Sequence, residues 1–302
     1  MPEGRISTSP EIFDRSLLRA RQRRAVALGP VTFLLNRVAD EFADRLTAVM
    51  RRFDLAADLG TPGDAVRAAL SRLASVGTIV ESGFAVQPEQ KSVAADEEAL
   101  PFRDASLDLV VSGLALQFVN DLPGVLVQIR RALKPDGLFL AALLGGETLT
   151  ELRQSFAAAE SEMEGGASPR VAPFADLREL GALLQRTGFA LPVTDVDRVT
   201  ARYATAFDLM HDLRRMGATN TLVARRRTPL RRATLLRMAE IYAERFADGD
   251  GRLRATFEIV WLSGWAQHPD QQKPLKPGSA KTRLADALGT HEIGAGEKSA
   301  DS

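Results

Sequence analysis

The stretch from Ala94 to Asp121 constrains the fold of this chain more than any other. An acidic turn, Asp96-Glu97-Glu98, follows the apolar segment 93–95, and a second apolar run, 107–111, ends in Ser112-Gly113. Near-continuous apolar runs that stop at polar or small residues are typical of parallel strands buried on both faces. Because α/β proteins bind ligands at the carboxyl ends of such strands, the stretch also predicts one side of a ligand site.

The chain before residue 145 repeats a strand–helix rhythm that predicts a doubly wound α/β sheet. Only ten residues separate Glu81 from Ser92, too few for an ordinary crossover helix, so we expect that helix to be vestigial or absent. The expected helices are 17–28, 33–50, 64–73 and 122–133, and the expected strands are 53–59, 78–81, 93–95, 107–111 and 138–144, with a turn at 134–137.

The second half of the chain adds further elements and an extended end. We expect helices over 174–186, 207–216 and 229–246, and strands over 191–199 and 255–262. Prolines and glycines after His268 predict an extended tail, disordered from Gly294. The expected domains are an N-terminal helical segment, 1–52, an α/β domain, 53–265, with a helical insertion around 200–250, and a tail, 266–302.

Composition narrows the possible functions. Lys+Arg and Asp+Glu both number 39 in 302 residues, so no net charge demands a nucleic acid or a membrane. The chain has no cysteine, and His211, His268 and His291 show no metal spacing, so we expect no metal site. No apolar run approaches the roughly 20 residues of a membrane span, and residues 1–10 lack the apolar segment of a secretory signal. We expect a cytoplasmic protein.

Two segments are rich in arginine. The helix 17–28 could contact an anionic ligand or a membrane surface, and 198–254, with thirteen arginines against six acids, could meet an acidic protein or nucleic acid. Solvated helix faces explain both segments more simply. Since no nucleic-acid module or aromatic platform accompanies them, nucleic acid is not an expected partner.

A glycine-containing loop, Asp58 to Gly63, follows the first expected strand. Glycine lets a backbone approach a ligand closely, and the start of the next helix presents free N–H groups. Alone this signal is weak, because any strand-to-helix turn can contain glycine and proline. Glu81 lies about 20 residues further on, where nucleotide-binding folds place an acid on ribose hydroxyls. That spacing favours a nucleotide-binding edge.

This chain resembles a class I S-adenosylmethionine-dependent methyltransferase in the order of its motifs, which are the Asp58-Leu59-Gly60 loop, the acidic turn, 108–112, 114–122 and 133–139, the last reading Leu-Lys-Pro-Asp-Gly-Leu-Phe. Later motifs resemble a narrower group, the methyltransferase-fold assembly factors of respiratory complex I (NADH:ubiquinone oxidoreductase) and their bacterial relatives. These motifs are 145–153, 164–169, 171–174, 216–220 and 278–280. The likeness runs from about Ile12 to Leu284, whereas malonyl-carrier-protein methyltransferases are similar only through the core.

The resemblance implies a seven-stranded, Rossmann-like α/β sheet with helices on both faces, N-terminal helices and a helical C-terminal insertion. Its last strand would run antiparallel to its neighbours. It also implies S-adenosylmethionine as cofactor, bound by Asp58, Gly60, Gly63, Glu81, Asp96, Glu97 and Ser112. The acceptor side would involve Gln117, Arg170 and Tyr203, with Glu97 beside them, although each could instead be a surface or turn residue.

Two departures from the family pattern put the cofactor in doubt. Pro62 and Asp64 stand where the family loop has glycines. Proline supplies no N–H group, and a carboxylate at the helix start repels a ligand carboxylate. Gly63 could restore the close approach of the backbone by a shift of register. Both an intact cofactor site and a degenerate one kept for its fold therefore stay open.

The reaction does not follow from the fold. The mitochondrial relatives are associated with hydroxylating an arginine of a complex I subunit. We therefore weigh an enzyme that modifies a protein, such as an arginine of a complex I subunit, against a non-catalytic assembly chaperone. Small-molecule methyl transfer is the least favoured. The expected partner is a protein substrate or assembly partner, and the resemblance allows a location peripheral to the inner membrane.

Overall fold

The computed structural model describes residues 11–84, 91–174 and 176–268, and residues 270, 286, 289 and 290. The chain divides into two units, Met1–Gln267 and His268–Ser302. All of the architecture below belongs to the first unit. The expected tail, 266–302, lies almost entirely outside the described residues, and so does the disorder expected from Gly294.

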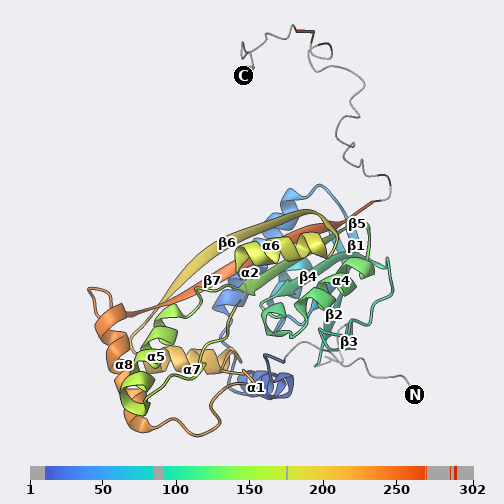
Figure 1. Cartoon of the computed structure of the whole chain (residues 1–302). Coiled ribbons are helices and arrows are strands. Elements are labelled where there is room, and N and C mark those ends of the chain that lie inside the picture. Colours follow the sequence, from blue (N-terminus) through green and yellow to red (C-terminus); the bar gives the residue numbers. More distant parts are fainter. Residues whose placement is uncertain are drawn as a thin grey trace, which may run out of the picture. The chain divides into compact units, whose positions relative to one another are not determined.

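A seven-stranded sheet forms the centre of the first unit (Figure 1). Its strand order is β3-β2-β1-β4-β5-β7-β6. Strands β1 to β5 run parallel, whereas β7 is antiparallel to both β5 and β6. This arrangement confirms the predicted fold class and the antiparallel last strand. The strands are β1 Phe53–Leu59, β2 Val76–Gly83, β3 Ser92–Ala94, β4 Leu107–Gly113, β5 Leu133–Leu144, β6 Phe189–Tyr203 and β7 Leu253–Ala266.

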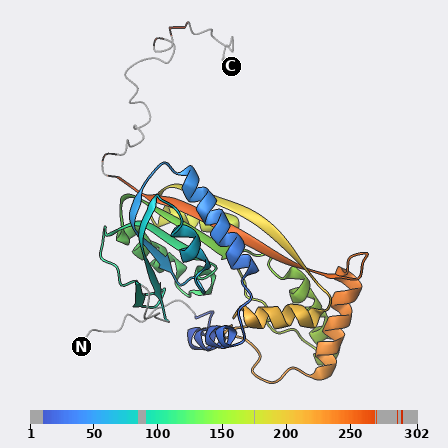
Figure 2. The same cartoon turned by 180° about the vertical axis from the view of Figure 1, so that it is seen from behind.

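Helices cover both faces of the sheet, as Figures 1 and 2 show. Side chains alternate along each strand, so Leu140 of β5 packs into a core with α2, α3, α5, α7 and α8, while Phe139 packs into a second core with α4 and α6. The helices are α1 Arg15–Ala27, α2 Phe33–Ala48, α3 Ala65–Leu70, α4 Leu122–Ala132, α5 Thr150–Glu164, α6 Leu177–Arg186, α7 Ala206–Arg215 and α8 Arg232–Phe246, with a 3₁₀ turn, η1, at Leu116–Phe118. None of the helices within the described ranges is long and apolar enough to cross a membrane.

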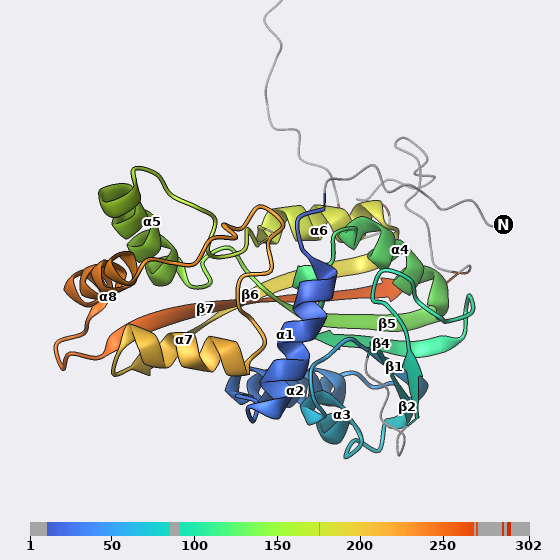
Figure 3. The same ribbon diagram turned by 90° about the horizontal axis from the view of Figure 1, so that it is seen from below.

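The β6–β7 pair is longer than the rest of the sheet and carries a helical lobe. Helices α7 and α8 lie between these strands in the sequence, and α5 packs beside α8. In Figure 3 the three helices surround the end of the pair that projects beyond the parallel strands. The lobe therefore extends the first core past the edge of the sheet.

Three local predictions were wrong. The expected turn at 134–137 is a bulge inside β5, where Asp136 adopts φ 58°. Helix α5 was not expected, because the sequence set 145–153 apart only as a motif. Strand β6 continues four residues beyond the predicted end, since antiparallel pairing with β7 runs on to Tyr203. The short connection after Glu81 contains residues 85–90, which lie outside the described residues.

Candidate functional site

Helix α1 lies across the carboxyl edge of the parallel strands (Figure 3). The segment before it is fixed by Asn120, whose Oδ1 accepts the N–H groups of Ile12 and Phe13 at 2.9 and 2.8 Å. Asn120 Nδ2 donates to Phe13 O at 3.1 Å, and Phe13 also pairs with Leu222. Asp14 caps the helix by accepting the N–H of Leu17. These contacts hold α1 over the edge where the sequence predicted a ligand site.

The loop after β1 is tied to β4 by hydrogen bonds. Asp58 is buried, and Oδ1 of its carboxylate accepts the hydroxyl of Thr61. The same hydroxyl accepts the N–H of Gly113 at 2.8 Å, and Ser112 Oγ donates to Leu59 O at 2.7 Å. The loop is therefore closed against the neighbouring strand, and the Ser112 hydroxyl is used in that closure.

Asp58 carries the most perturbed carboxylate of this edge. Burial and, to a smaller extent, the nearby charge of Glu81 raise its pKa to about 7, against the lowering effects of the Thr61 hydrogen bond and Arg67. Glu81 lies beside Asp58 on β2 and forms an ion pair with Arg67, with 2.8 Å between Oε1 and Nε. Both acids at the strand ends therefore have partners within the chain.

Arginines of α1 bind the acidic turn. Arg15 Nη2 donates to Asp96 Oδ1 at 2.7 Å and to Glu97 Oε2, and Arg19 donates to Asp96 Oδ2. Burial alone would raise the pKa of Asp96, but the N–H of Glu98 and the Arg15 and Arg19 guanidinium groups bring it below its usual value. The basic face of α1 is thus partly an intramolecular ion-pair surface rather than a solvated one.

The side chain of Glu97 lies on the backbone of Gly60. Gly60 adopts φ +66°, and a Cβ built there would be 2.7 Å from Glu97 Cγ and from Oε1. Glycine at this position is therefore needed both for the backbone angle and for the contact. A ligand that approaches Gly60 needs the space that Glu97 occupies, so these residues do not fit S-adenosylmethionine as their side chains lie here.

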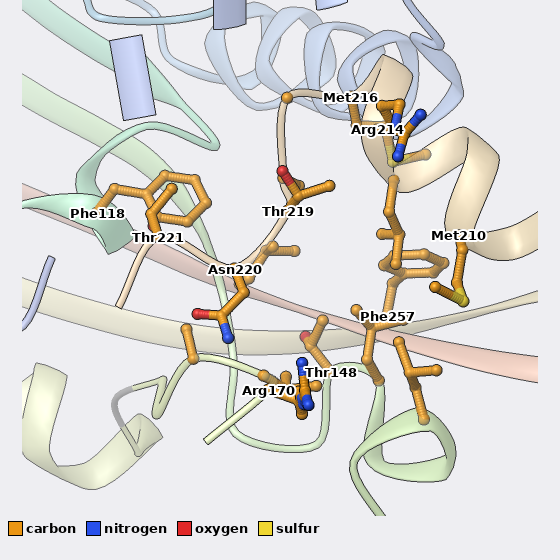
Figure 4. Close-up of a pocket in the computed structure, with 18 of the residues that line it drawn as sticks. Phe118, Thr148, Arg170, Met210, Arg214, Met216, Thr219, Asn220, Thr221 and Phe257 are labelled. Carbon is orange, nitrogen blue, oxygen red and sulfur yellow. The ribbon is translucent and has the colours of Figure 1, made fainter. Parts of the chain in front are cut away.

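A cavity of about 450 Å³ adjoins this edge (Figure 4). Pro62, Leu114 and Gln117 reach it from the sheet edge, and α2, α5, α7 and the segments 170–174 and 216–222 supply its other walls. Its volume lies in the range of small-molecule sites. The resemblance placed the methyl-acceptor side here, beyond the loop that would hold the cofactor.

Arg170 lines this cavity and is fixed by a buried acid. Its Nε donates to Glu160 Oε1 at 2.9 Å, and its guanidinium carbon lies 5.3 Å from the centre of the Phe156 ring. Glu160 also accepts the N–H of Ser168 at 2.6 Å. Burial would raise the pKa of Glu160, but Ser168 and Arg170 bring it below its usual value. Arg170 therefore enters the cavity in one defined orientation.

Gln117 lines the same cavity, and its side-chain oxygen is buried. Its Nε2 donates to Leu114 O at 2.8 Å, and because a carbonyl can only accept, the amide oxygen must face the other way. Gln117 Oε1 and the Thr219 hydroxyl are buried, and neither has a hydrogen-bond partner among the described residues. Both side chains line the cavity. Buried polar atoms of this kind point to a bound ligand.

The structure brings Gln117 and Arg170 together but not Tyr203. Tyr203 ends β6 outside the described lining of the cavity, where burial and then the carboxylate of Asp212 raise its pKa. Thr219 was missed, although it lies in a motif, 216–220, that the sequence set apart. Within the ranges that the structure describes, no three His, Asp or Glu side chains are grouped so that they could hold a metal ion.

Comparisons with known proteins agree with this fold. Residues 67–141 match the family model described as "Methyltransferase domain". A putative methyltransferase from Bacillus halodurans has a solved structure that covers 76% of this chain, and 98% of its own, at a TM-score of 0.52 and 14% identity. The chain therefore has the class I methyltransferase fold.

Two curated relatives define its place within that class. The mitochondrial arginine-hydroxylase NDUFAF5 of Danio rerio is 39% identical over 291 residues, which cover 91% of this chain and 89% of the fish protein. The malonyl-[acyl-carrier protein] O-methyltransferase of Gallionella capsiferriformans is 38% identical, but over only 60% of this chain and 59% of its own. The chain belongs to the family of the arginine-hydroxylase NDUFAF5, as its later motifs indicated.

Proposed function

We propose that this protein modifies an arginine of a protein partner, a subunit of respiratory complex I, during assembly of that complex. The observation that carries the proposal is the extent of the NDUFAF5 likeness, which spans about nine-tenths of both chains. The matched methyltransferase domain ends at residue 141, before most of the residues that form the cavity. The family-wide likeness therefore includes the helical lobe, which is the part that builds the candidate acceptor site.

Gln117 and Arg170 are the residues that we propose for the acceptor side. Gln117 offers an oxygen that can accept an N–H group of a substrate, and Arg170 offers a fixed positive edge. Tyr203 is not part of this proposal, because it lies away from the cavity-lining residues. Positioning groups of this kind act by orienting reactants.

S-adenosylmethionine is the cofactor that the fold class favours, and Gly60 lies in the loop that such a ligand would approach. The proposed contacts remain Asp58, Gly60, Gly63, Glu81, Asp96, Glu97 and Ser112. Occupation of this edge requires the Glu97 side chain to leave Gly60. The covered glycine supports a second candidate function, in which the chain is an assembly chaperone that kept the fold without the chemistry.

Peptide mass spectrometry of complex I subunits tests this proposal. We would compare a strain lacking the gene with strains that express the wild type, Gln117→Ala or the matched control Tyr203→Phe. The proposal predicts an arginine that gains the mass of one oxygen or one methylene with the wild type and Tyr203→Phe, but much less with Gln117→Ala. An unmodified subunit in a fully assembled complex would support the chaperone instead.

A further inference from the structure

The charges around the cavity have one sign. Among the described residues, Arg170 and Arg214 line the cavity, and no aspartate or glutamate lines it. In Figure 4, Arg170 and Thr148 lie at the bottom of the cavity and Arg214 and Met216 at the top. An anion entering this space meets favourable charge from two directions.

The walls between these arginines are mostly apolar. Leucines of α2 and α5, Phe156, Phe174, Met210 and Phe257 supply most of the surface. Burial of apolar ligand surface against such walls contributes about 25 cal/mol per Å². A largely aliphatic or aromatic body therefore fits the cavity better than a polar one.

A guanidinium group is a poor ligand for the same space. A buried cation is costly unless a carboxylate pairs with it, and here the described lining offers two cations instead. The carboxylate of Glu160 could have paired with a bound guanidinium, but it already accepts hydrogen bonds from Nε and Nη2 of Arg170. Arg170 Nη1 has no hydrogen-bond partner within the described part of the chain, so one edge of the guanidinium is available to a carboxylate.

We propose that this cavity binds an amphipathic carboxylic acid, with its carboxylate on Arg170 and its apolar body among the leucine and phenylalanine side chains. A hydroxyl or N–H group on the body would meet Gln117 Oε1 or the Thr219 hydroxyl. This inference goes beyond the proposed function, because it assigns a small-molecule site. The arginine of the protein partner would then approach Gln117 from the sheet edge and would not enter the apolar part of the cavity.

Three ligands with one alkyl chain test the proposal: laurate, lauryl alcohol and laurylguanidinium. Each is titrated calorimetrically into the full, delipidated chain below its critical micelle concentration. We expect laurate to bind at one site with at least tenfold higher affinity than lauryl alcohol. Its advantage over laurylguanidinium should be larger still. Equal or tighter binding of laurylguanidinium, or no binding of laurate, would overturn the proposal.

Two variants locate the site. Glu160→Gln combined with Arg170→Met removes the ion pair without leaving a buried charge alone, and it should bring laurate affinity down to that of the alcohol. Met210→Trp fills the cavity and should weaken laurate and the alcohol alike by about tenfold or more. Laurate binding that is unchanged in both folded variants would place the ligand elsewhere and refute the assignment. This experiment needs no protein partner, so its failure is distinct from failure of arginine modification.

Discussion

The cofactor edge and the cavity lie next to each other but are built in opposite ways. At the edge, the acids have partners within the chain: Thr61 binds Asp58, Arg67 binds Glu81, and Arg15 binds the acidic turn, although Nε of Arg15 and Nε of Arg19 have no hydrogen bond in the described structure. In the cavity, Gln117 Oε1 and the Thr219 hydroxyl are buried without partners in the described structure.

This contrast separates residues that stabilise the fold from residues that are available to bind a ligand. Polar groups that pair within the chain contribute to stability whether or not a ligand binds. Polar groups left unpaired in an otherwise apolar cavity cost free energy until a ligand meets them. The residues of the family loop are therefore expected to affect stability, and those of the cavity to affect binding, apart from the acid that anchors Arg170.

The largest effect is expected for Glu160→Ala. It would leave the largely buried Arg170 without its counter-charge, and we expect a loss of about 3–5 kcal/mol in the free energy of unfolding, measured by urea titration. Glu162→Ala on the same helix removes an exposed ion pair with Arg237 and should lower the free energy of unfolding far less. Similar losses for the two variants would contradict the role of Glu160 as an anchor.

Asp58→Asn should stabilise the protein at alkaline pH. Because the folded-state pKa of about 7 exceeds the ordinary 3.8, the folded state binds the extra proton. The stabilisation from that proton is fully present below pH 3.8 and is lost as pH rises through 7. Asparagine avoids the buried charge, so we expect a gain of about 1–3 kcal/mol at pH 8 that shrinks as the pH falls below 7 and is almost absent near the ordinary pKa of 3.8. Thermal melts across this range would show a pH-independent difference if burial of Asp58 were unimportant.

Asn120→Ala should loosen α1 with a moderate effect. The variant deletes the acceptor of two N–H groups and the donor to Phe13. Loss of these hydrogen bonds should lower the local stability of the segment before α1 by about 1–2 kcal/mol. Hydrogen exchange of the α1 amides should speed up about tenfold. Asn120→Asp keeps the accepting oxygen and should retain most of the protection. Equal exchange in both variants would argue against a role of Asn120 in holding α1.

The smallest effect is expected for Tyr203→Phe. The variant removes only the hydroxyl that interacts with Asp212, so we expect less than about 1 kcal/mol in stability and unchanged laurate affinity. A drop in laurate affinity beyond threefold would mean that Tyr203 belongs to the cavity after all.

The sheet could be predicted from sequence because its strands are marked by local patterns. Residues 107–111 and 138–144 are mostly apolar runs that end at small or polar residues, as expected for strands buried on both faces. The bulge at Asp136 could not be predicted, since Pro135-Asp136-Gly137 carries the chemistry of a turn, and only pairing with β4 reveals that the strand continues.

The site was predicted less well, because its decisive contacts join distant segments. The contact of Glu97 with Gly60 spans 37 positions, and Arg170 depends on Glu160 across the segment 164–169, a motif that did not show which acid would bind the arginine. Thr219 carries no signal of its own in the sequence. What marks it is a hydroxyl left unpaired by packing, which only the folded chain shows.

The most direct test of the contrast is calorimetric titration of the wild type and Glu97→Ala with S-adenosylmethionine, using the double variant Glu97→Ala/Asp58→Ala as control. Because the Glu97 side chain lies on Gly60, the wild type should bind S-adenosylmethionine weakly. Removal of that side chain in Glu97→Ala should tighten binding at least tenfold, or about 1.4 kcal/mol. The double variant should lose that gain. Micromolar binding by the wild type, with no gain in Glu97→Ala, would contradict the view that the chain closes its own cofactor edge.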